Sequence, residues 1–267
     1  MARMRTWTEA QALEWRRSFG PPVRPTYEEC KIYKRELGRL GKTAKVLLMG
    51  STPEIRDVSS EMGASLTVVD ESEKHYSEVK AIMACDSTDE IFVKKNWADM
   101  DFSSEFDFVL GDNVLSILAP GDAKKVIENV HKSLSPGGRW ITRVMLYNPG
   151  EDFTSPDTLN SRISACAKKK DLYENLYVPF LAYYKNEVGK VAGSEIYGKL
   201  KRDVDKGLFP QFCAEVFLTL SRYDDENYLV QRDEFEQEIS SKFSIVRSFD
   251  NTEPFSKNWV IYVLAKN

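Results

Sequence analysis

The chain has 267 residues, of which 42% are hydrophobic and 29% are charged, and this composition excludes the disordered and collagen-like classes. Its net charge is -4 and it carries no dense block of Lys and Arg, so it lacks the electrostatic signature of a nucleic-acid-binding protein. A chain of this length lies near the upper limit for one hydrophobic core, which predicts a single core with additions.

The cysteines predict neither a metal site nor a disulfide framework. They are far apart, with no C-x-x-C pair and no histidine at zinc-like spacing; they are Cys30, Cys85, Cys166 and Cys213. The N-terminal segment MARMRTWTEAQALEWRRSFG has charges throughout and no apolar core of the kind found in signal peptides, and no stretch approaches the ~20 apolar residues of a membrane helix. We therefore expect a cytoplasmic protein with no metal and no membrane partner.

Two helices are predicted ahead of the first strand. Over residues 6–19 apolar side chains recur near helical spacing, and the turn segment GPP follows. A second helix is expected at 26–41, because Thr26 and Glu29 have the spacing of a capping box. Residues 1–44 would then form an N-terminal helical part. Its helices either act as a lid over a binding site or simply pack against the sheet.

Short apolar strands then alternate with helices, which is typical of a parallel sheet covered on both faces. In chain order the predicted elements are a strand at 45–49, a helix at 54–62, a strand at 65–69, a helix at 73–84, strands at 91–94 and 106–110, a helix at 120–135 and a strand at 139–145. The predicted fold class is α/β, with a doubly wound, Rossmann-like sheet over residues 45–146.

The pattern changes after the fifth strand. Residues 147–230 predict helices without a strand, including one near 214–222, so we expect a helical insertion that caps a substrate site. Its aromatic side chains could line a pocket or pack as core, and core packing is the favoured interpretation for any single ring. These side chains are Tyr173, Tyr177, Phe180, Tyr183 and Tyr184. Residues 231–267 return to the sheet, with a helix near 232–243 and two strands that could pair as an antiparallel hairpin at its edge.

The polar residues that follow the strands form the candidate site, because ligands of doubly wound sheets bind beyond the carboxyl ends of the strands. Gly50 and Ser51 follow the first strand, and a glycine there lets the backbone approach a ligand closely. Asp70 comes twenty positions after Gly50, the spacing at which an acid binds the ribose hydroxyls of a nucleotide, and Glu71 follows it. One glycine and one acid are a weak signal, and an ordinary structural turn is at least as consistent with them.

Five segments together resemble the class I S-adenosylmethionine-dependent methyltransferases. They are VLLMGSTPE (46–54), LTVVDES (66–72), NWADMDF (96–102), FDFVLGDNVLSIL (106–118) and HKSLSPGGRWITR (131–143). The resemblance covers residues 45–144 and, more loosely, the closing strands. It implies a seven-stranded sheet with an antiparallel last strand, S-adenosylmethionine as the cofactor, and methyl transfer as the activity.

The resemblance also implies roles for single residues in binding the cofactor. Gly50 would let the backbone approach its methionine part, and Asp70 would hold its ribose hydroxyls. Asn96 would contact the adenine amino group, where the family often has Asp. Trp97 would cover the adenine ring and offer its backbone amide.

Gly111 and Asp112 follow the fourth strand and, by the same resemblance, would lie beside the sulfonium and the substrate. Methyl transfer is an in-line displacement that positioning and desolvation can accelerate, so it needs no obligatory acid or base. Asp112 is the candidate catalytic base or substrate-orienting group. An Asp at a strand end that caps a helix is the commoner alternative.

The first loop departs from the pattern of that family. The G-x-G-x-G motif is reduced to Gly50, with Thr52 and Glu54 at the later glycine positions. We expect Glu54 to face the amino group of the cofactor. An equally favoured alternative is that Glu54 is an acid in the first turn of a helix, where it interacts favourably with the helix dipole.

The sequence therefore predicts a methyltransferase for a small-molecule acceptor, because its acidic charge and aromatic insertion do not suit nucleic acid or a large protein. One alternative is a protein that binds S-adenosylmethionine for other chemistry, such as aminocarboxypropyl transfer, or as a sensor or scaffold. A less favoured alternative is an NAD-dependent oxidoreductase, which would have two or three glycines in the first turn and no closing antiparallel hairpin. The oligomeric state is not predicted.

Overall fold

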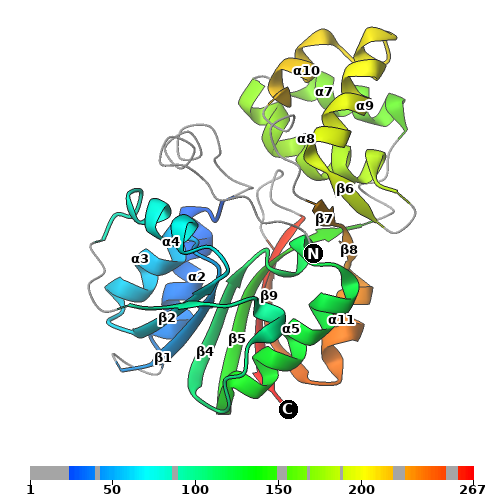
Figure 1. Cartoon of the computed structure of the whole chain (residues 1–267). Coiled ribbons are helices and arrows are strands. Elements are labelled where there is room, and N and C mark those ends of the chain that lie inside the picture. The colour runs from blue at the N-terminus through cyan, green and yellow to red at the C-terminus, as the bar shows by residue number, and fades with distance from the viewer. Residues whose placement is uncertain are drawn as a thin grey trace.

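The computed structural model describes residues 24–39, 43–85, 90–148, 155–166, 169–186, 189–218, 226–250 and 258–267. A central sheet in the order β3-β2-β1-β4-β5-β10-β9 dominates the structure (Figure 1). Its strands are β1 (Lys45–Met49), β2 (Ser65–Asp70), β3 (Ile91–Lys94), β4 (Phe106–Asp112), β5 (Leu134–Tyr147), β9 (Phe243–Asp250) and β10 (Trp259–Lys266). The predicted helix at 6–19 lies outside the described residues.

The first five strands of the sheet are parallel, and the last strand in the chain reverses direction. β10 pairs antiparallel with β5 on one side and with β9 on the other. This confirms the predicted antiparallel last strand, and the short β8 (Val230–Gln231) adds an eighth strand by pairing with the end of β5. Because β10 is buried along most of its length and β9 is largely exposed, β9 forms the edge of the sheet.

Helices cover both faces of the sheet: α2 (Tyr27–Leu37), α3 (Pro53–Glu61) and α4 (Glu73–Lys80) on one, α5 (Pro120–Ser133) and α11 (Arg232–Ser240) on the other (Figure 1). Successive side chains of a strand point to opposite faces. In β1, Val46 and Leu48 pack in the core that α2 and α3 cover, whereas Leu47 and Met49 pack in the core of α5 and α11. The predicted doubly wound α/β fold is confirmed.

The capping box predicted for α2 is present: the Thr26 hydroxyl accepts from the Glu29 amide at 3.1 Å, and the Glu29 carboxylate accepts from the Thr26 amide at 2.6 Å. α2 ends at Leu37, before the predicted position. α4 is also shorter than predicted, because the chain beyond it turns away and its amides at positions 84 and 85 each donate to Asp57 at 2.9 Å. β4 is longer than predicted and carries Asp112 as its last residue.

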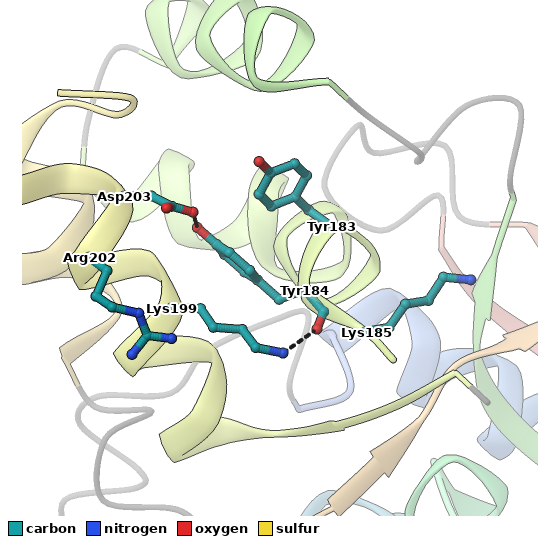
Figure 2. A pocket seen from close by; sticks show the side chains of 6 residues that line it. All are labelled: Tyr183, Tyr184, Lys185, Lys199, Arg202 and Asp203. Atoms are coloured by element: carbon teal, nitrogen blue, oxygen red, sulfur yellow. Dashed lines mark hydrogen bonds between the residues drawn. The ribbon is translucent and has the colours of Figure 1, made fainter. Parts of the chain in front are cut away.

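A helical part follows β5 and contains α7 (Pro156–Ala165), α8 (Lys169–Tyr184), α9 (Gly193–Asp205) and α10 (Gln211–Val216). The prediction that it lacks strands is wrong, because β6 (Lys190–Ala192) and β7 (Glu226–Tyr228) form a small antiparallel sheet. Strands of three residues are too short to show alternation in the sequence. The predicted helix at 214–222 ends at Val216, and residues 219–225 lie outside the described part. A cavity lies between α8 and α9 (Figure 2). None of the described helices has the length and apolar character needed to cross a membrane.

Candidate functional site

The predicted site residues lie at the carboxyl ends of the four strands β1 to β4, where the parallel strands end at one edge of the sheet. β1 is followed by Gly50, Ser51 and Glu54, β2 ends with Asp70 and is followed by Glu71, β3 is followed by Asn96 and Trp97, and β4 ends with Gly111 and Asp112. Direct contacts connect the ends of β1, β2 and β3. Other contacts connect the end of β4 to α2 and β5.

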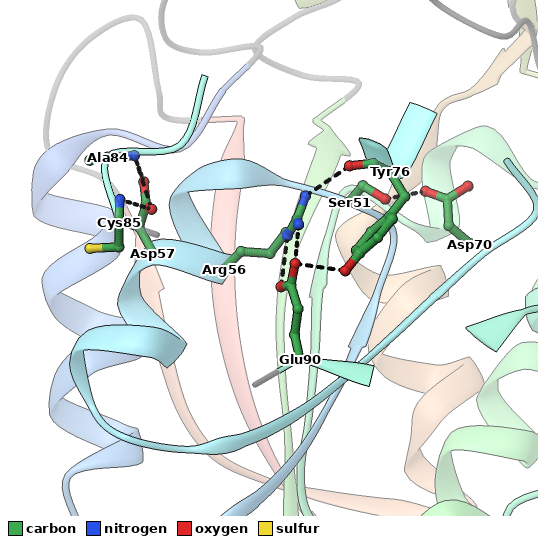
Figure 3. A network of polar contacts seen from close by, with 8 residues as sticks. All are labelled: Ser51, Arg56, Asp57, Asp70, Tyr76, Ala84, Cys85 and Glu90. Atoms are coloured by element: carbon green, nitrogen blue, oxygen red, sulfur yellow. Dashed lines mark hydrogen bonds and ion pairs between the residues drawn. The ribbon is translucent and has the colours of Figure 1, made fainter. Parts of the chain in front are cut away.

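Asp70 is held in place by the loop residues on either side of it. Its Oδ2 accepts a hydrogen bond from the Ser51 hydroxyl at 2.7 Å (Figure 3). Its Oδ1 accepts a hydrogen bond from the Ser72 amide at 3.0 Å. Asp70 is 1% exposed. Each carboxylate oxygen has a second lone pair, so the oriented carboxylate keeps the capacity to accept hydrogen bonds from a ligand.

Gly50 and Trp97 lie against each other. Gly50 has φ +86°, and a Cβ at this position would lie 3.4 Å from Cζ2 of the Trp97 ring. The Trp97 indole donates to the Val69 carbonyl at 2.8 Å, as does the Gly50 amide at 2.9 Å. The indole is a core side chain, 6% exposed. The one glycine left in the first loop therefore has a structural reason in its left-handed backbone, independent of any ligand.

Asn96 connects the ends of β2 and β3. Its Oδ1 accepts from the Ala98 amide at 2.8 Å and so starts the short helix η1 (Trp97–Asp99), while its Nδ2 donates to the Glu71 carboxylate. Both polar atoms of the side chain thus have partners within the chain. A contact with an adenine amino group would use the second lone pair of Oδ1.

Asp112 belongs to a buried charge cluster that joins β4, β5 and α2. Arg143 donates from Nη1 to Asp112 at 3.1 Å and from Nε to Glu29 at 2.8 Å, and its guanidinium stacks 4.0 Å from the centre of the Trp259 ring. Burial raises the pKa of Asp112 from 3.8 to about 6; Arg143 opposes this shift, and the negative charges of Glu29 and Glu54 add to it. A carboxyl with this pKa is well suited to accept a proton near neutral pH.

The helix-capping alternative for Asp112 is not what the structure has. The short helix after β4, η2 (Leu115–Ile117), has Val114 at its N-cap and no side-chain cap. The hydrogen bond of Asp112 to Arg143 orients the carboxylate instead.

Glu54 lies in the first turn of α3 and pairs with Arg24. The pKa of the Cys30 thiol is raised to about 12, mainly by burial. The negative charges of three nearby acids, Glu54, Glu29 and Asp112, add to the rise. A thiol with this pKa is protonated and is a poor nucleophile at neutral pH. The three carboxylates give this end of the site an acidic character.

Several buried polar atoms at this edge have no hydrogen-bond partner among the described residues. They are Oε2 of Glu54, Oδ1 of Asn113, Oγ1 of Thr142 and Nε of Arg24. Asn113 follows Asp112 and has φ +55°, a left-handed conformation that Asn tolerates better than most residues. Unpaired buried polar atoms are costly, so these atoms mark a place where a polar ligand could bind.

Sequence reasoning missed the residues that hold the end of β4. Arg143 is a charged residue within the apolar strand β5, which was a usable signal. Tyr33 is fully buried and donates to the Gly111 carbonyl at 2.8 Å. Glu29 was predicted only as a helix cap. A Cβ on Gly111 would lie 3.1 Å from Val114, so close packing explains this glycine.

A second buried ion pair lies between α3, α4 and the start of β3, next to the site. Arg56 of α3 donates from Nε to Glu90 at 3.0 Å, and the Tyr76 hydroxyl of α4 donates to the same carboxylate at 2.8 Å (Figure 3). The Arg56 guanidinium also lies over the Tyr76 ring. These contacts fix α3 and α4 relative to the start of β3. Among the described residues, no cluster of three or more His, Cys, Asp or Glu could hold a metal ion.

Solved structures share this fold at low sequence identity. The N-methyltransferase NodS from Bradyrhizobium japonicum, in complex with S-adenosylhomocysteine, has a TM-score of 0.53 and 10% identity, over 96% of this chain and 97% of its own. A Burkholderia thailandensis 1,6-didemethyltoxoflavin-N1-methyltransferase, also with S-adenosylhomocysteine, has a TM-score of 0.52 and 14% identity, over 89% of this chain and 77% of its own. A Rhodobacter sphaeroides protein described as a candidate Zn-dependent alcohol dehydrogenase has a TM-score of 0.61 and 16% identity, over 97% of this chain and 98% of its own.

No protein-family model matches the chain, and no curated protein matches it in sequence. At the identities above, the similarity concerns the fold, and the activities named for the neighbours remain theirs. Several of the neighbours are S-adenosylmethionine-dependent methyltransferases, and their structures hold the demethylated cofactor. The chain therefore has the Rossmann-like fold of this class of methyltransferases, including its antiparallel strand β10.

Proposed function

We propose that the protein is an S-adenosylmethionine-dependent methyltransferase that acts on a small-molecule acceptor. The observation that carries the proposal is the acidic cluster at the ends of β1 and β4, in which the buried Glu54 Oε2 has no partner among the described residues. S-adenosylmethionine supplies a transferable methyl group on a sulfonium and carries an ammonium group. Both positive charges suit a cluster in which two arginines, Arg24 and Arg143, face three carboxylates.

Five of the predicted residues would hold the cofactor under this proposal, and Ser51 and Trp97 would support them. Asp70, oriented by Ser51, would accept the ribose hydroxyls, and the Glu71–Asn96 pair would lie beside the adenosine part. Glu54 would face the amino group. Gly50 would give the close backbone approach at the methionine part, with Trp97 supporting the loop from the core.

Asp112 would act on the acceptor. Its pKa of about 6 means that most molecules carry the carboxylate at pH 7, ready to take a proton from the attacking group. Arg143 fixes the carboxylate oxygen at 3.1 Å and so determines where that proton is accepted. The remaining acceleration would come from holding donor and acceptor in line in a site from which water is excluded.

A small acceptor fits the charge of the chain and its arrangement. The net charge of -4 does not favour nucleic acid, and the helical part after β5 stands above the carboxyl edge of the sheet, where it could cover a substrate (Figure 1). We propose that residues 147–230 form a substrate cap on the cofactor-binding core of residues 45–146, that residues 231–267 close the sheet, and that the protein works in the cytoplasm.

A second candidate is binding of S-adenosylmethionine without methyl transfer, as a sensor or for aminocarboxypropyl chemistry. The single glycine of the first loop favours it, because Thr52 and Glu54 stand where the methyltransferase pattern has glycines. An NAD-dependent oxidoreductase is less consistent with the structure, since β10 lies antiparallel between β5 and β9.

The test is product analysis after incubation with S-adenosylmethionine and a panel of small acceptors. Methyl transfer yields S-adenosylhomocysteine, aminocarboxypropyl transfer yields methylthioadenosine, and a sensor yields neither. S-adenosylhomocysteine formed only when an acceptor is present would support the proposal. Methylthioadenosine alone, or no product with any acceptor although the cofactor binds, would favour the second candidate.

Asp70→Asn provides a matched test of the cofactor assignment. It should weaken S-adenosylhomocysteine binding at least tenfold, because a neutral amide accepts hydroxyl donors less strongly than a carboxylate. Asp101→Asn, at an exposed acid beyond β3, is the control and should leave affinity unchanged. Equal affinities of both variants and the wild type would contradict the role given to Asp70.

A further inference from the structure

The helical part contains a cavity of about 420 Å³ between the end of α8 and α9, away from the residues described above (Figure 2). Its lining consists of two tyrosines, three cations and one acid: Tyr183, Tyr184, Lys185, Lys199, Arg202 and Asp203. The volume is in the range of pockets that hold small organic ligands.

The cavity is cationic in a protein that is acidic as a whole. Three positive side chains face one negative side chain in the lining, whereas the chain carries a net charge of -4. The single acid, Asp203, is engaged, because its Oδ2 accepts from the Tyr184 hydroxyl at 3.0 Å. Asp203 keeps its charge and Glu195 pairs with Lys199, so three cations face two acids, and the remaining positive charge favours an anion.

Two of the cations have hydrogen-bond donors to spare. Lys199 donates to the Tyr184 carbonyl at 3.1 Å and pairs with Glu195 at 2.7 Å, which leaves one of its three N–H groups. Arg202 makes no side-chain hydrogen bond or ion pair with the described residues, so its planar fork of donors is available. In Figure 2 Lys199 and Arg202 lie on the same side of the Tyr184 ring.

The tyrosines add flat, apolar walls to the cavity. The rings of Tyr183 and Tyr184 meet edge to face with centroids 4.7 Å apart. The Tyr183 hydroxyl makes no hydrogen bond with the described residues. Aromatic rings with a polar tip bind flat ring systems through their faces and edges.

The cavity adjoins the carboxyl edge of the sheet through Lys185. Its ammonium lies 4.2 Å from the centre of the Tyr147 ring, at the end of β5. Tyr147 and Arg143 are four residues apart on one strand and so point to the same face, about 13 Å apart along it. A ligand that reached from the cavity to Asp112 would be elongated.

We propose that this cavity binds the acidic end of the methyl acceptor, and that the acceptor is an elongated acid that carries a flat ring. The anionic group contacts Arg202 and Lys199, and the ring lies against the tyrosines. The term acceptor rests on the proposed methyltransferase function, whereas the anion site rests on the cavity itself.

The experiment titrates the wild-type protein with phenyl phosphate, and with phenol as the neutral counterpart, and follows both by calorimetry. Arg202→Gln and Lys199→Gln are the test variants. Lys201→Gln, at an exposed position of the same helix, is the control for the change in charge. Arg202 is exposed and unpaired among the described residues, so its variant should fold as the wild type does. Each sample is also titrated with S-adenosylhomocysteine.

Phenyl phosphate should bind the wild type at least tenfold more tightly than phenol, and each test variant should lose about tenfold in affinity. Lys201→Gln should bind as the wild type, and all four proteins should bind S-adenosylhomocysteine equally. Equal binding of phenyl phosphate and phenol, or an equal loss in the control, would overturn the anion site. Failure of S-adenosylhomocysteine to bind any of them would overturn the proposed function and the acceptor assignment, and the variants would still report on the anion site.

Discussion

Two buried arginines of this protein use the same chemistry for different ends. Arg56 pairs with one acid, Glu90, and a tyrosine hydroxyl satisfies the same carboxylate. Arg143 faces two acids, Glu29 and Asp112, with a third acid, Glu54, near enough to affect the pKa of Asp112.

The two clusters shift the pKa of their acids in opposite directions. Burial acts to raise the pKa of Glu90, but the hydrogen bonds from Arg56 and Tyr76 outweigh it and the pKa is lowered. At Asp112 burial prevails over Arg143, and the pKa is raised to about 6. A balanced buried pair fixes the positions of helices, whereas a cluster with more acids than cations raises the pKa of one carboxyl toward neutral pH, where it can take a proton.

The largest difference between the two clusters should appear in the free energy of unfolding when their arginines are replaced. Arg56→Met should lower the free energy of unfolding by about 3–5 kcal/mol, because Glu90 is left buried without a cation. Adding Glu90→Gln should recover most of this loss. Arg143→Met should cost about as much, and adding Asp112→Asn should recover little, because Glu29 remains buried. Urea unfolding of the four variants measures this, and equal recovery in both double variants would contradict the difference between the clusters.

The contributions of Asp112 and Glu90 to the free energy of unfolding should depend on pH in opposite directions. The raised pKa of Asp112 contributes stability below about pH 4 that is lost as the pH rises through about 6. Relative to Asp112→Asn, the wild type should therefore lose up to about 3 kcal/mol between pH 4 and pH 7. The lowered pKa of Glu90 has the opposite effect: its contribution is present above the ordinary pKa and is lost as the pH falls through the lowered one. Unfolding of the wild type, Asp112→Asn and Glu90→Gln is followed from about pH 3 to about pH 7, because the contribution of Glu90 is lost below its ordinary pKa of 4.5. A shift of the same sign for both variants relative to the wild type would contradict the difference between the clusters.

The smallest effect should follow from a change at Glu54. Glu54→Gln removes the charge of the carboxylate with the unpaired oxygen, and it should weaken the binding of S-adenosylmethionine about tenfold. The free energy of unfolding should fall by about 1–3 kcal/mol, because Arg24 loses its charged partner. Glu61→Gln, at a half-exposed acid of the same helix, is the matched control and should leave the affinity unchanged. Parallel titrations and unfolding curves measure both, and unchanged affinity of Glu54→Gln would contradict the role given to Glu54.

Local patterns were enough to predict most strands of the central sheet, but the two-residue strand β8 was missed. The apolar runs at 45–49 and 91–94 matched β1 and β3 at both ends, and the Thr26–Glu29 capping box placed the start of α2. The small sheet of β6 and β7 was missed because its strands of three residues carry no periodic signal.

The chemistry of the site was less accessible to sequence reasoning, because its decisive contacts are distant in the chain. Arg143 and Glu29 are 114 residues apart, and neither local spacing nor composition pairs them. The packing of Trp97 on Gly50 likewise depends on where β3 ends relative to β1, which is a tertiary property. Strand ends indicated which residues meet, but not how their hydrogen bonds are already used.

The central claim is that the carboxyl edge of the sheet binds S-adenosylmethionine. The most direct test is isothermal titration of the purified protein, freed of any copurified ligand, with S-adenosylmethionine, S-adenosylhomocysteine and NADH. The account predicts that the first two bind with one site per chain and that NADH does not bind. Binding of NADH, or of none of the three, would contradict it.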